Sequence, residues 1–258
     1  MKHKDEMLRF DPIERRIYQT ICQNEGLKAR EIAASLGIDH ATVNRFLYVS
    51  PLMKELCWQD SEFRWHGIIR QARPHDELYE FSVYYSTVGE FMQLDDERWL
   101  ALLKLGCENI GRSLSDTRGL MHSFLDARET MLRLFEDLRA FGCAGFDNWE
   151  IVFELCIKKS RHIRIYADVL LITKRHVFTM EFKMKDRIEA DEVAQCAKYC
   201  TYLDLIFGDG YEIVPVLVLT RAHDLYRDEI VQGTDASIQV CAGDMLYNAL
   251  DAYLGFLR

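Results

Sequence analysis

Residues 176–185 (HVFTMEFKMK) alternate between two kinds of side chain, the pattern of a β-strand with one buried face. Every second residue of a strand points to the same face. The apolar set is Phe178, Met180, Phe182 and Met184. The other set is Thr179, Glu181, Lys183 and Lys185. The strand therefore presents a carboxylate and an ammonium group two residues apart on the face that is not core.

This run is the third of three consecutive strand-like runs, after 149–159 (WEIVFELCIKK) and 163–173 (IRIYADVLLIT). A helix is expected at 123–141 before them and another at 189–207 after them. A buried strand (213–220), a shorter strand (237–242) and a final helix (244–257) complete the chain. The order predicts an α/β fold of the α+β kind, with a mixed sheet flanked by helices.

Asp168 is a single acid in the apolar run 163–173, where it shares a strand face with Tyr166 and Leu170. A buried carboxylate needs a metal, a cation or hydrogen bonds. Asp168 and Glu181 on neighbouring strands would bind Mg²⁺ or Mn²⁺ through oxygen ligands. Such an ion activates water at a phosphodiester, and Lys183 would orient that water or stabilise the transition state. The alternative is a structural ion-pair network of these three residues.

The spacing of these residues resembles the core motif of the PD-(D/E)XK nucleases, with Asp168, twelve intervening residues, and then Glu181-Phe182-Lys183. On the next helix, Gln195 and Tyr199 resemble the QxxxY motif of the RecB-like branch, where these residues support DNA binding and the active centre. Ala167 stands where the family's name has proline. The resemblance implies a restriction-endonuclease-like sheet, a Mg²⁺ or Mn²⁺ cofactor and a DNA substrate.

The family also uses an acid from the first helix or strand, and three glutamates are candidates. Glu129 and Glu136 lie seven residues apart on one helix face, and Glu154 lies within the first strand. Glu154 is slightly favoured because its strand neighbours are apolar, but the spacing leaves the choice open. Lys185 and Lys198 are candidate phosphate contacts, although such lysines are also common on solvated surfaces.

Residues 10–70 follow the pattern of a winged helix. Asp11 can cap a helix that begins at Pro12, and Gly37 makes the turn between two further helices. Asp39 caps the second of these, and the segment LCWQDSEFRWHGI predicts a two-stranded wing. The candidate nucleic-acid contacts are His40, Asn44, Arg45, Tyr48 and Trp65.

Three roles are open for this segment. Ordinary duplex binding is favoured, and protein contact is an alternative. Asn44, Arg45, Tyr48 and Trp65 also resemble residues of Zα domains, which bind left-handed nucleic acid by shape. Up to Arg70 the segment is nearly neutral, with eleven basic and ten acidic residues, which argues against tight autonomous binding of DNA.

The charge of the chain is unevenly distributed. The formal net charge is −9, yet residues 158–187 hold nine basic and three acidic residues. This local excess of positive charge could bind phosphate.

The eight cysteines contain no CxxC pair, so free thiols in a reducing cytoplasm are expected rather than a zinc or iron–sulfur site. No run is apolar enough for a membrane span, and no signal peptide is expected.

The domain prediction is a winged helix at 1–70, a helical connector at 71–120 and a nuclease domain at 121–258. The expected function is hydrolysis of DNA in defence or DNA processing, with a homodimer as one expected state because many such nucleases act as dimers. Two other classes stay open. These are a DNA-binding regulator with a non-catalytic nuclease-like domain, and an interaction module of a defence complex.

Overall fold

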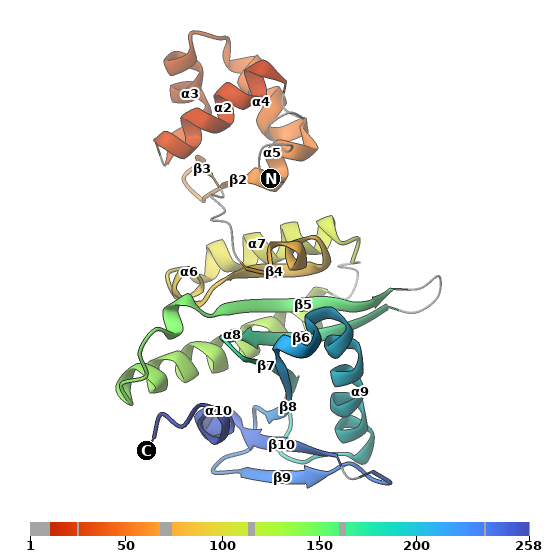
Figure 1. Cartoon of the computed structure of the whole chain (residues 1–258). Coiled ribbons are helices and arrows are strands. Elements are labelled where there is room, and N and C mark those ends of the chain that lie inside the picture. Colours follow the sequence, from red (N-terminus) through yellow and green to blue (C-terminus); the bar gives the residue numbers. More distant parts are fainter. Residues whose placement is uncertain are drawn as a thin grey trace. The chain divides into compact units, whose positions relative to one another are not determined.

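The computed structural model describes residues 11–24, 26–67, 74–112, 117–159, 164–234 and 236–257. The chain divides into two compact units, Met1–Asp76 with Asp95–Leu105, and Glu77–Leu94 with Gly106–Arg258. The predicted boundary between residues 70 and 71 lies outside the described residues. Each unit is described by itself below (Figure 1).

The first unit is a bundle of short helices with a small antiparallel sheet of order β1-β3-β2. Its elements are α2 (Pro12–Gln23), β1 (Leu27–Lys28), α3 (Ala29–Leu36), α4 (His40–Val49), α5 (Pro51–Leu56), β2 (Cys57–Gln59) and β3 (Arg64–Gly67). This order, with the helix-turn-helix pair α3–α4 and a β2–β3 hairpin, confirms the predicted pattern.

Local sequence explains where these helices begin and end. Asp11 accepts a hydrogen bond from Ile13 N over 2.8 Å and caps α2. Asp39 caps α4 in the same way, through Thr42 N at 2.8 Å. Gly37 ends α3 with a φ of 64°, a left-handed conformation in which glycine avoids the clash of a Cβ atom. The apolar sides of the helices then form one core, which includes Ile17, Ile21, Ile32, Val43, Leu47 and Trp65.

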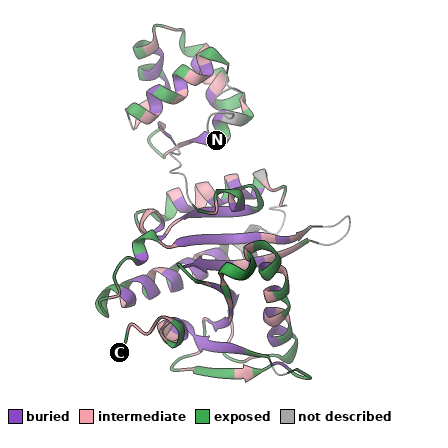
Figure 2. Cartoon of the chain, viewed as in Figure 1, coloured by how far each residue is buried: buried purple, intermediate pink, exposed green. Residues whose placement is uncertain are grey.

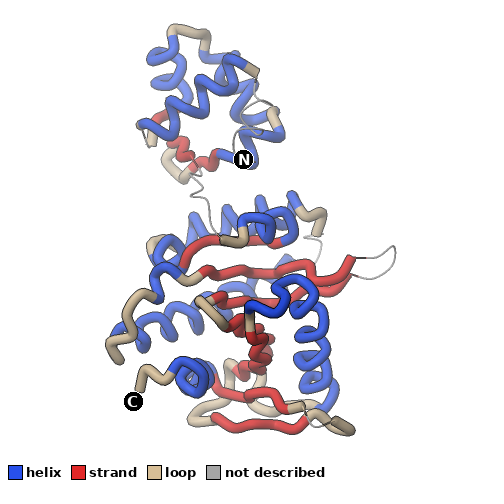
Figure 3. The backbone as a smooth tube through the Cα atoms, viewed as in Figure 1, coloured by secondary structure: helices blue, strands red, loops and turns tan. Residues whose placement is uncertain are grey.

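The second unit is built on a seven-stranded mixed sheet, of order β4-β5-β6-β7-β8-β10-β9 among the described residues. Its strands are β4 (Ser82–Thr87), β5 (Glu150–Lys159), β6 (Arg164–Ile172), β7 (His176–Lys183), β8 (Glu212–Leu219), β9 (Tyr226–Ile230) and β10 (Ser237–Ala242). β7 and β10 each run parallel to β8, and the other neighbouring pairs are antiparallel. Figure 3 shows β5 and β6 as two long strands that lie side by side.

Helices cover both faces of this sheet. They are α6 (Val88–Met92), α8 (Thr117–Ala140), α9 (Ala190–Phe207) and α10 (Leu246–Leu254), with the short turns η1 (Asp76–Phe81), η2 (Phe146–Asn148), η3 (Gly208–Gly210) and η4 (Gly243–Met245). Helix α7 (Asp96–Asn109) contributes to both units.

The two faces have separate cores. On one face, Tyr199 and Leu203 of α9 pack with Val152 and Val177. The neighbouring residues on the strands point to the other face, where Phe153 stacks against Phe91 of α6 and Phe178 meets Tyr253 of α10. Burial of these apolar surfaces is the main force that stabilises the sheet.

The segment 71–120 differs from the predicted helical connector, because β4 joins the large sheet through an antiparallel pairing with β5. β9 was also not predicted. It is a mostly exposed edge strand, as Figure 2 shows, so it lacks the apolar alternation by which sequence reveals a strand. The structure records no disulfide bond between the described cysteines.

Candidate active site

Two neighbouring strands bring the predicted acidic pair together. β6 and β7 are antiparallel, with Val169 paired to Met180. One position further in the same register, Asp168 faces Glu181. The backbone N–H of Phe182 donates to Asp168 Oδ2 over 2.9 Å and fixes this carboxylate against β7.

An open cleft of about 610 Å³ lies over these residues, on the face of the sheet that α9 covers. Six predicted residues line it: Glu154, Asp168, Glu181, Gln195, Lys198 and Tyr199. The cleft is also lined by Arg112, Arg164, Tyr166 and Asp191, which were not predicted as site residues. No local pattern marks Arg112, because it follows α7 and reaches the cleft only through the tertiary fold.

Glu181 is the best-connected side chain of the site. Its Oε1 atom accepts from Lys183 Nζ over 2.9 Å and from Gln195 Nε2 over 3.0 Å. Gln195 Nε2 also donates to the Tyr199 hydroxyl. Glu181 Oε2 is buried and accepts no hydrogen bond from any described residue. A buried carboxylate oxygen without a hydrogen-bond donor lowers the stability of the fold unless a ligand binds to it.

The two carboxylates disfavour each other's ionised forms. Burial, and then the nearby charge of Asp168, raise the pKa of Glu181 to about 8. Burial also raises the pKa of Asp168, against the opposing effects of the Phe182 hydrogen bond and the Lys183 charge. A cation between the two side chains would remove both penalties.

Lys183 is held as a charged ammonium group. Burial alone would lower its pKa, but the charge and the hydrogen bond of Glu181, with the charge of Asp168, raise the pKa above the ordinary value. The side chain is 26% exposed, so the ammonium group is available next to the carboxylates.

The donor set fits a hard divalent cation. Within the described ranges, no group of three or more His, Cys, Asp or Glu side chains is arranged to hold a metal. Mg²⁺, however, commonly uses one or two carboxylates and completes its shell with water and substrate phosphates. Asp168 and the unpartnered oxygen of Glu181 match that requirement.

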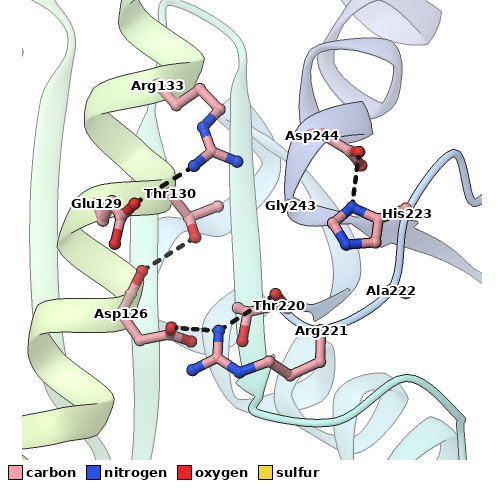
Figure 4. Close-up of a pocket in the computed structure, with 10 residues that line it drawn as sticks. All are labelled: Asp126, Glu129, Thr130, Arg133, Thr220, Arg221, Ala222, His223, Gly243 and Asp244. Carbon is pink, nitrogen blue, oxygen red and sulfur yellow. Dashed lines mark hydrogen bonds and ion pairs between the residues drawn. The ribbon is translucent and has the colours of Figure 1, made fainter.

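The structure separates the three candidate glutamates for a further acid. Glu154 lines the cleft, and its carboxylate forms an ion pair with Arg112. Glu136 is exposed on α8. Glu129 lies in a different, smaller pocket and pairs with Arg133 at 3.4 Å (Figure 4). Glu154 is therefore the candidate that shares a cleft with Asp168 and Glu181.

The smaller pocket, of about 50 Å³, lies between α8 and the segments that follow β8 and β10 (Figure 4). Arg221 pairs with Asp126 at 2.8 Å, and His223 Nδ1 lies 3.3 Å from a carboxylate oxygen of Asp244. It holds none of the residues of the predicted catalytic motif.

The two candidate phosphate-contact lysines have different surroundings. Lys198 lines the cleft on α9. Lys185 instead bridges Glu189 and Glu192, with 2.8 Å to each carboxylate. The structure thus brings only Lys198 to the cleft.

In the first unit, α4 carries most of the predicted nucleic-acid contacts. Arg45 is exposed, with its guanidinium 5.1 Å from the centre of the Phe46 ring. Asn44 Nδ2 and His40 Nε2 lie 3.4 Å apart. These side chains occupy the helix that follows the Gly37 turn, the position of a recognition helix in a helix-turn-helix.

Tyr48 and Trp65 connect this helix to the wing. The Tyr48 hydroxyl hydrogen-bonds with the amide of Gln59, and its ring lies edge-on to Trp65 at 5.3 Å. Trp65 is only 4% exposed, which leaves little surface for the direct contact that we predicted. Trp65 belongs to the same core as Val43 and Leu47 of α4, so it supports that helix.

Comparison with known families agrees with this geometry. Residues 10–47 match a family model described as winged helix-turn-helix DNA-binding. The match covers α2, α3 and most of α4, and it supports engagement of nucleic acid by this domain. No curated protein and no solved structure matches the chain. None of the helices described is both long and apolar enough to span a bilayer.

Proposed function

We propose that the chain is a nuclease that hydrolyses DNA with Mg²⁺ or Mn²⁺, and that the second unit has a restriction-endonuclease-like fold of the PD-(D/E)XK kind. The observation that carries the proposal is that Asp168 and Glu181 meet at one cleft, with Lys183 Nζ 2.9 Å from Glu181 Oε1 and with Glu181 Oε2 buried and unpartnered among the described residues.

Asp168 and Glu181 would hold the cation, which when bound supplies an activated water and neutralises charge on the phosphodiester. The chain's own residues prepare this site. The Phe182 N–H fixes Asp168, and Gln195 fixes Glu181 from α9. Positioning of this kind reduces the reorganisation that the reaction requires.

Lys183 supplies a fixed positive charge beside the reacting centre. Its ammonium group can orient a water molecule by hydrogen bonding, or stabilise negative charge that develops on the phosphate. Lys198 and Arg164 line the same cleft and offer further contacts for phosphates of the substrate backbone.

DNA is the proposed substrate because the matched model at residues 10–47 is described as DNA-binding. The same match favours a second candidate function, a DNA-binding regulator whose second unit binds without cutting. In the regulator, Asp168 and Glu181 would have no need of a metal.

A cleavage panel separates the two functions. The purified chain is incubated with linear duplex, circular duplex, single-stranded DNA and RNA, each with Mg²⁺, Mn²⁺ or EDTA. The nuclease proposal predicts metal-dependent cleavage of at least one DNA substrate, and loss of cleavage in Lys183→Ala with the fold intact by circular dichroism. Absence of cleavage in the wild type would favour the regulator. Equal cleavage by the variant would overturn the role assigned to Lys183.

A further inference from the structure

Glu154 and Arg112 form an ion pair at the edge of the proposed metal site. In the pairing of β5 with β6, Phe153 faces Val169 and Leu155 faces Ala167, so Glu154 stands opposite Asp168. Asp168 therefore has Glu181 on one neighbouring strand and Glu154 on the other, although the Glu154 carboxylate is occupied by the Arg112 guanidinium.

The backbone at Glu154 is unusual for a strand. Its φ is 54°, in the left-handed region that non-glycine residues rarely adopt. Residues held in such conformations persist only where their surroundings impose them, and they cluster at active sites and switches. Here the left-handed residue is one that lines the cleft.

Arg112 packs against an aromatic ring and is partly exposed in the cleft. Its guanidinium lies 4.5 Å from the centre of the Tyr166 ring, a cation–π arrangement. Arg164 Nη1 donates to the carbonyl of the preceding residue, Gly111, over 2.9 Å. The Arg112 side chain is 22% exposed, whereas that of Glu154 is 6% exposed. The arginine thus reaches solvent in the cleft while the glutamate does not.

We propose that Arg112 is an exchangeable counter-ion of Glu154. It neutralises the carboxylate while no divalent cation is present, and it turns to a backbone phosphate of the substrate when a cation takes over Glu154. The inference rests on the proposed function, because it assigns Glu154 as a further ligand of the same cation. Arg112 acts on metal binding through Glu154, so toward the cation it is a positioning residue.

Two substitutions should have opposite and counter-intuitive effects. Arg112→Gln removes the competitor for Glu154, so the affinity for Mn²⁺ should rise by about tenfold, within the usual range of coupling between two bound ligands. Glu154→Gln releases the arginine without any metal, so in EDTA the affinity for a short DNA duplex should rise above that of the wild type. The same variant should bind Mn²⁺ more weakly.

The affinity for Mn²⁺ is measured by isothermal titration calorimetry, and the affinity for DNA by fluorescence anisotropy of a labelled duplex in EDTA. Arg133→Gln is the matched control, because Arg133 also pairs with a glutamate, Glu129, in the pocket of Figure 4. It should match the wild type in both measurements. Arg112→Lys keeps the charge and should retain the affinity of the wild type for Mn²⁺, and it serves if Arg112→Gln fails to fold.

Failure of this inference is distinguishable from failure of the proposed function. If the wild type binds Mn²⁺ and cleaves DNA, but Arg112→Gln has unchanged affinity for Mn²⁺ and Glu154→Gln has unchanged affinity for DNA in EDTA, only the counter-ion role is overturned. If the wild type neither binds Mn²⁺ nor cleaves, the nuclease proposal fails. The proposed replacement of Arg112 by a cation at Glu154 then fails too, whatever affinity for DNA Glu154→Gln shows.

Discussion

Lys183 Nζ lies 2.9 Å from Glu181 Oε1, and both side chains project from the same face of β7, with Glu181 buried and Lys183 partly exposed. The pair is held by a strand whose opposite face is part of the core. The backbone that carries both groups is therefore fixed by packing, which suits a catalytic pair.

Replacement of this lysine should remove catalysis but not metal binding. Lys183→Met keeps the length of the side chain and loses the charge, so the rate of DNA cleavage should fall by about 100-fold or more. Affinity for Mn²⁺ should stay the same or rise, because the ammonium group competes with a cation for Glu181. Single-turnover cleavage and calorimetry measure the two effects. Lys174→Met, at an exposed position, is the control, and equal rates for both variants would contradict the assigned role.

Stability without metal should depend on pH through Glu181. Its pKa is about 8 in the folded chain, above the ordinary value of 4.5, so the folded state binds more protons between these two values. The free energy of unfolding should therefore fall as pH rises from about 4.5 to 8. Urea unfolding across this range should show a smaller decrease in the free energy of unfolding for Glu181→Gln than for Glu136→Gln. Mn²⁺ should reduce the decrease seen in the wild type. Identical slopes in both variants would show that Glu181 does not titrate in this way.

The packing of α7 against β4 should tolerate no side chain at Gly106. A Cβ atom there would lie 1.7 Å from the carbonyl oxygen of Val83, a backbone atom that cannot turn aside. Gly106→Ala should lower the free energy of unfolding by about 3 kcal/mol. Gly210→Ala is the matched control, since a Cβ atom there meets nothing within 4 Å. Thermal unfolding followed by circular dichroism compares the two, and equal melting temperatures would exclude this close approach.

Arg45 should contribute to DNA binding by the first unit. It is an exposed cation on α4, so Arg45→Ala should weaken binding to duplex DNA and reduce the slope of log affinity against log salt by about one, if it contacts a phosphate. Lys54→Ala, an exposed lysine on α5, serves as control. Binding in EDTA, followed by fluorescence anisotropy, keeps cleavage out of the measurement. If Arg45→Ala binds like the wild type, α4 does not contact DNA through this residue.

Sequence predicted the parts of the fold that have strong local signals. Asp11 and Asp39 cap the helices expected of them, and the runs around Asp168 and Glu181 form neighbouring strands. Alternation within a strand also placed Glu181 and Lys183 on one face, because that relation depends on backbone geometry alone.

Other features depend on contacts between distant segments, and sequence could not reveal them. β4 was missed because its pairing with β5 joins residues about 70 positions apart. The choice among Glu129, Glu136 and Glu154 needed the sheet register, and the pairing of Arg112 with Glu154 needed the complete tertiary fold. The burial of Trp65 behind α4 was likewise not visible in the pattern of the wing.

The most direct test of the central claim is calorimetric titration of Mn²⁺ into the full chain at about pH 9, where Glu181 is ionised. We predict saturable binding to the wild type and to Asp244→Asn, a control from the smaller pocket, and loss of that binding in Asp168→Asn. Absence of binding to the wild type, or unchanged binding to Asp168→Asn, would contradict a shared cation site at Asp168 and Glu181.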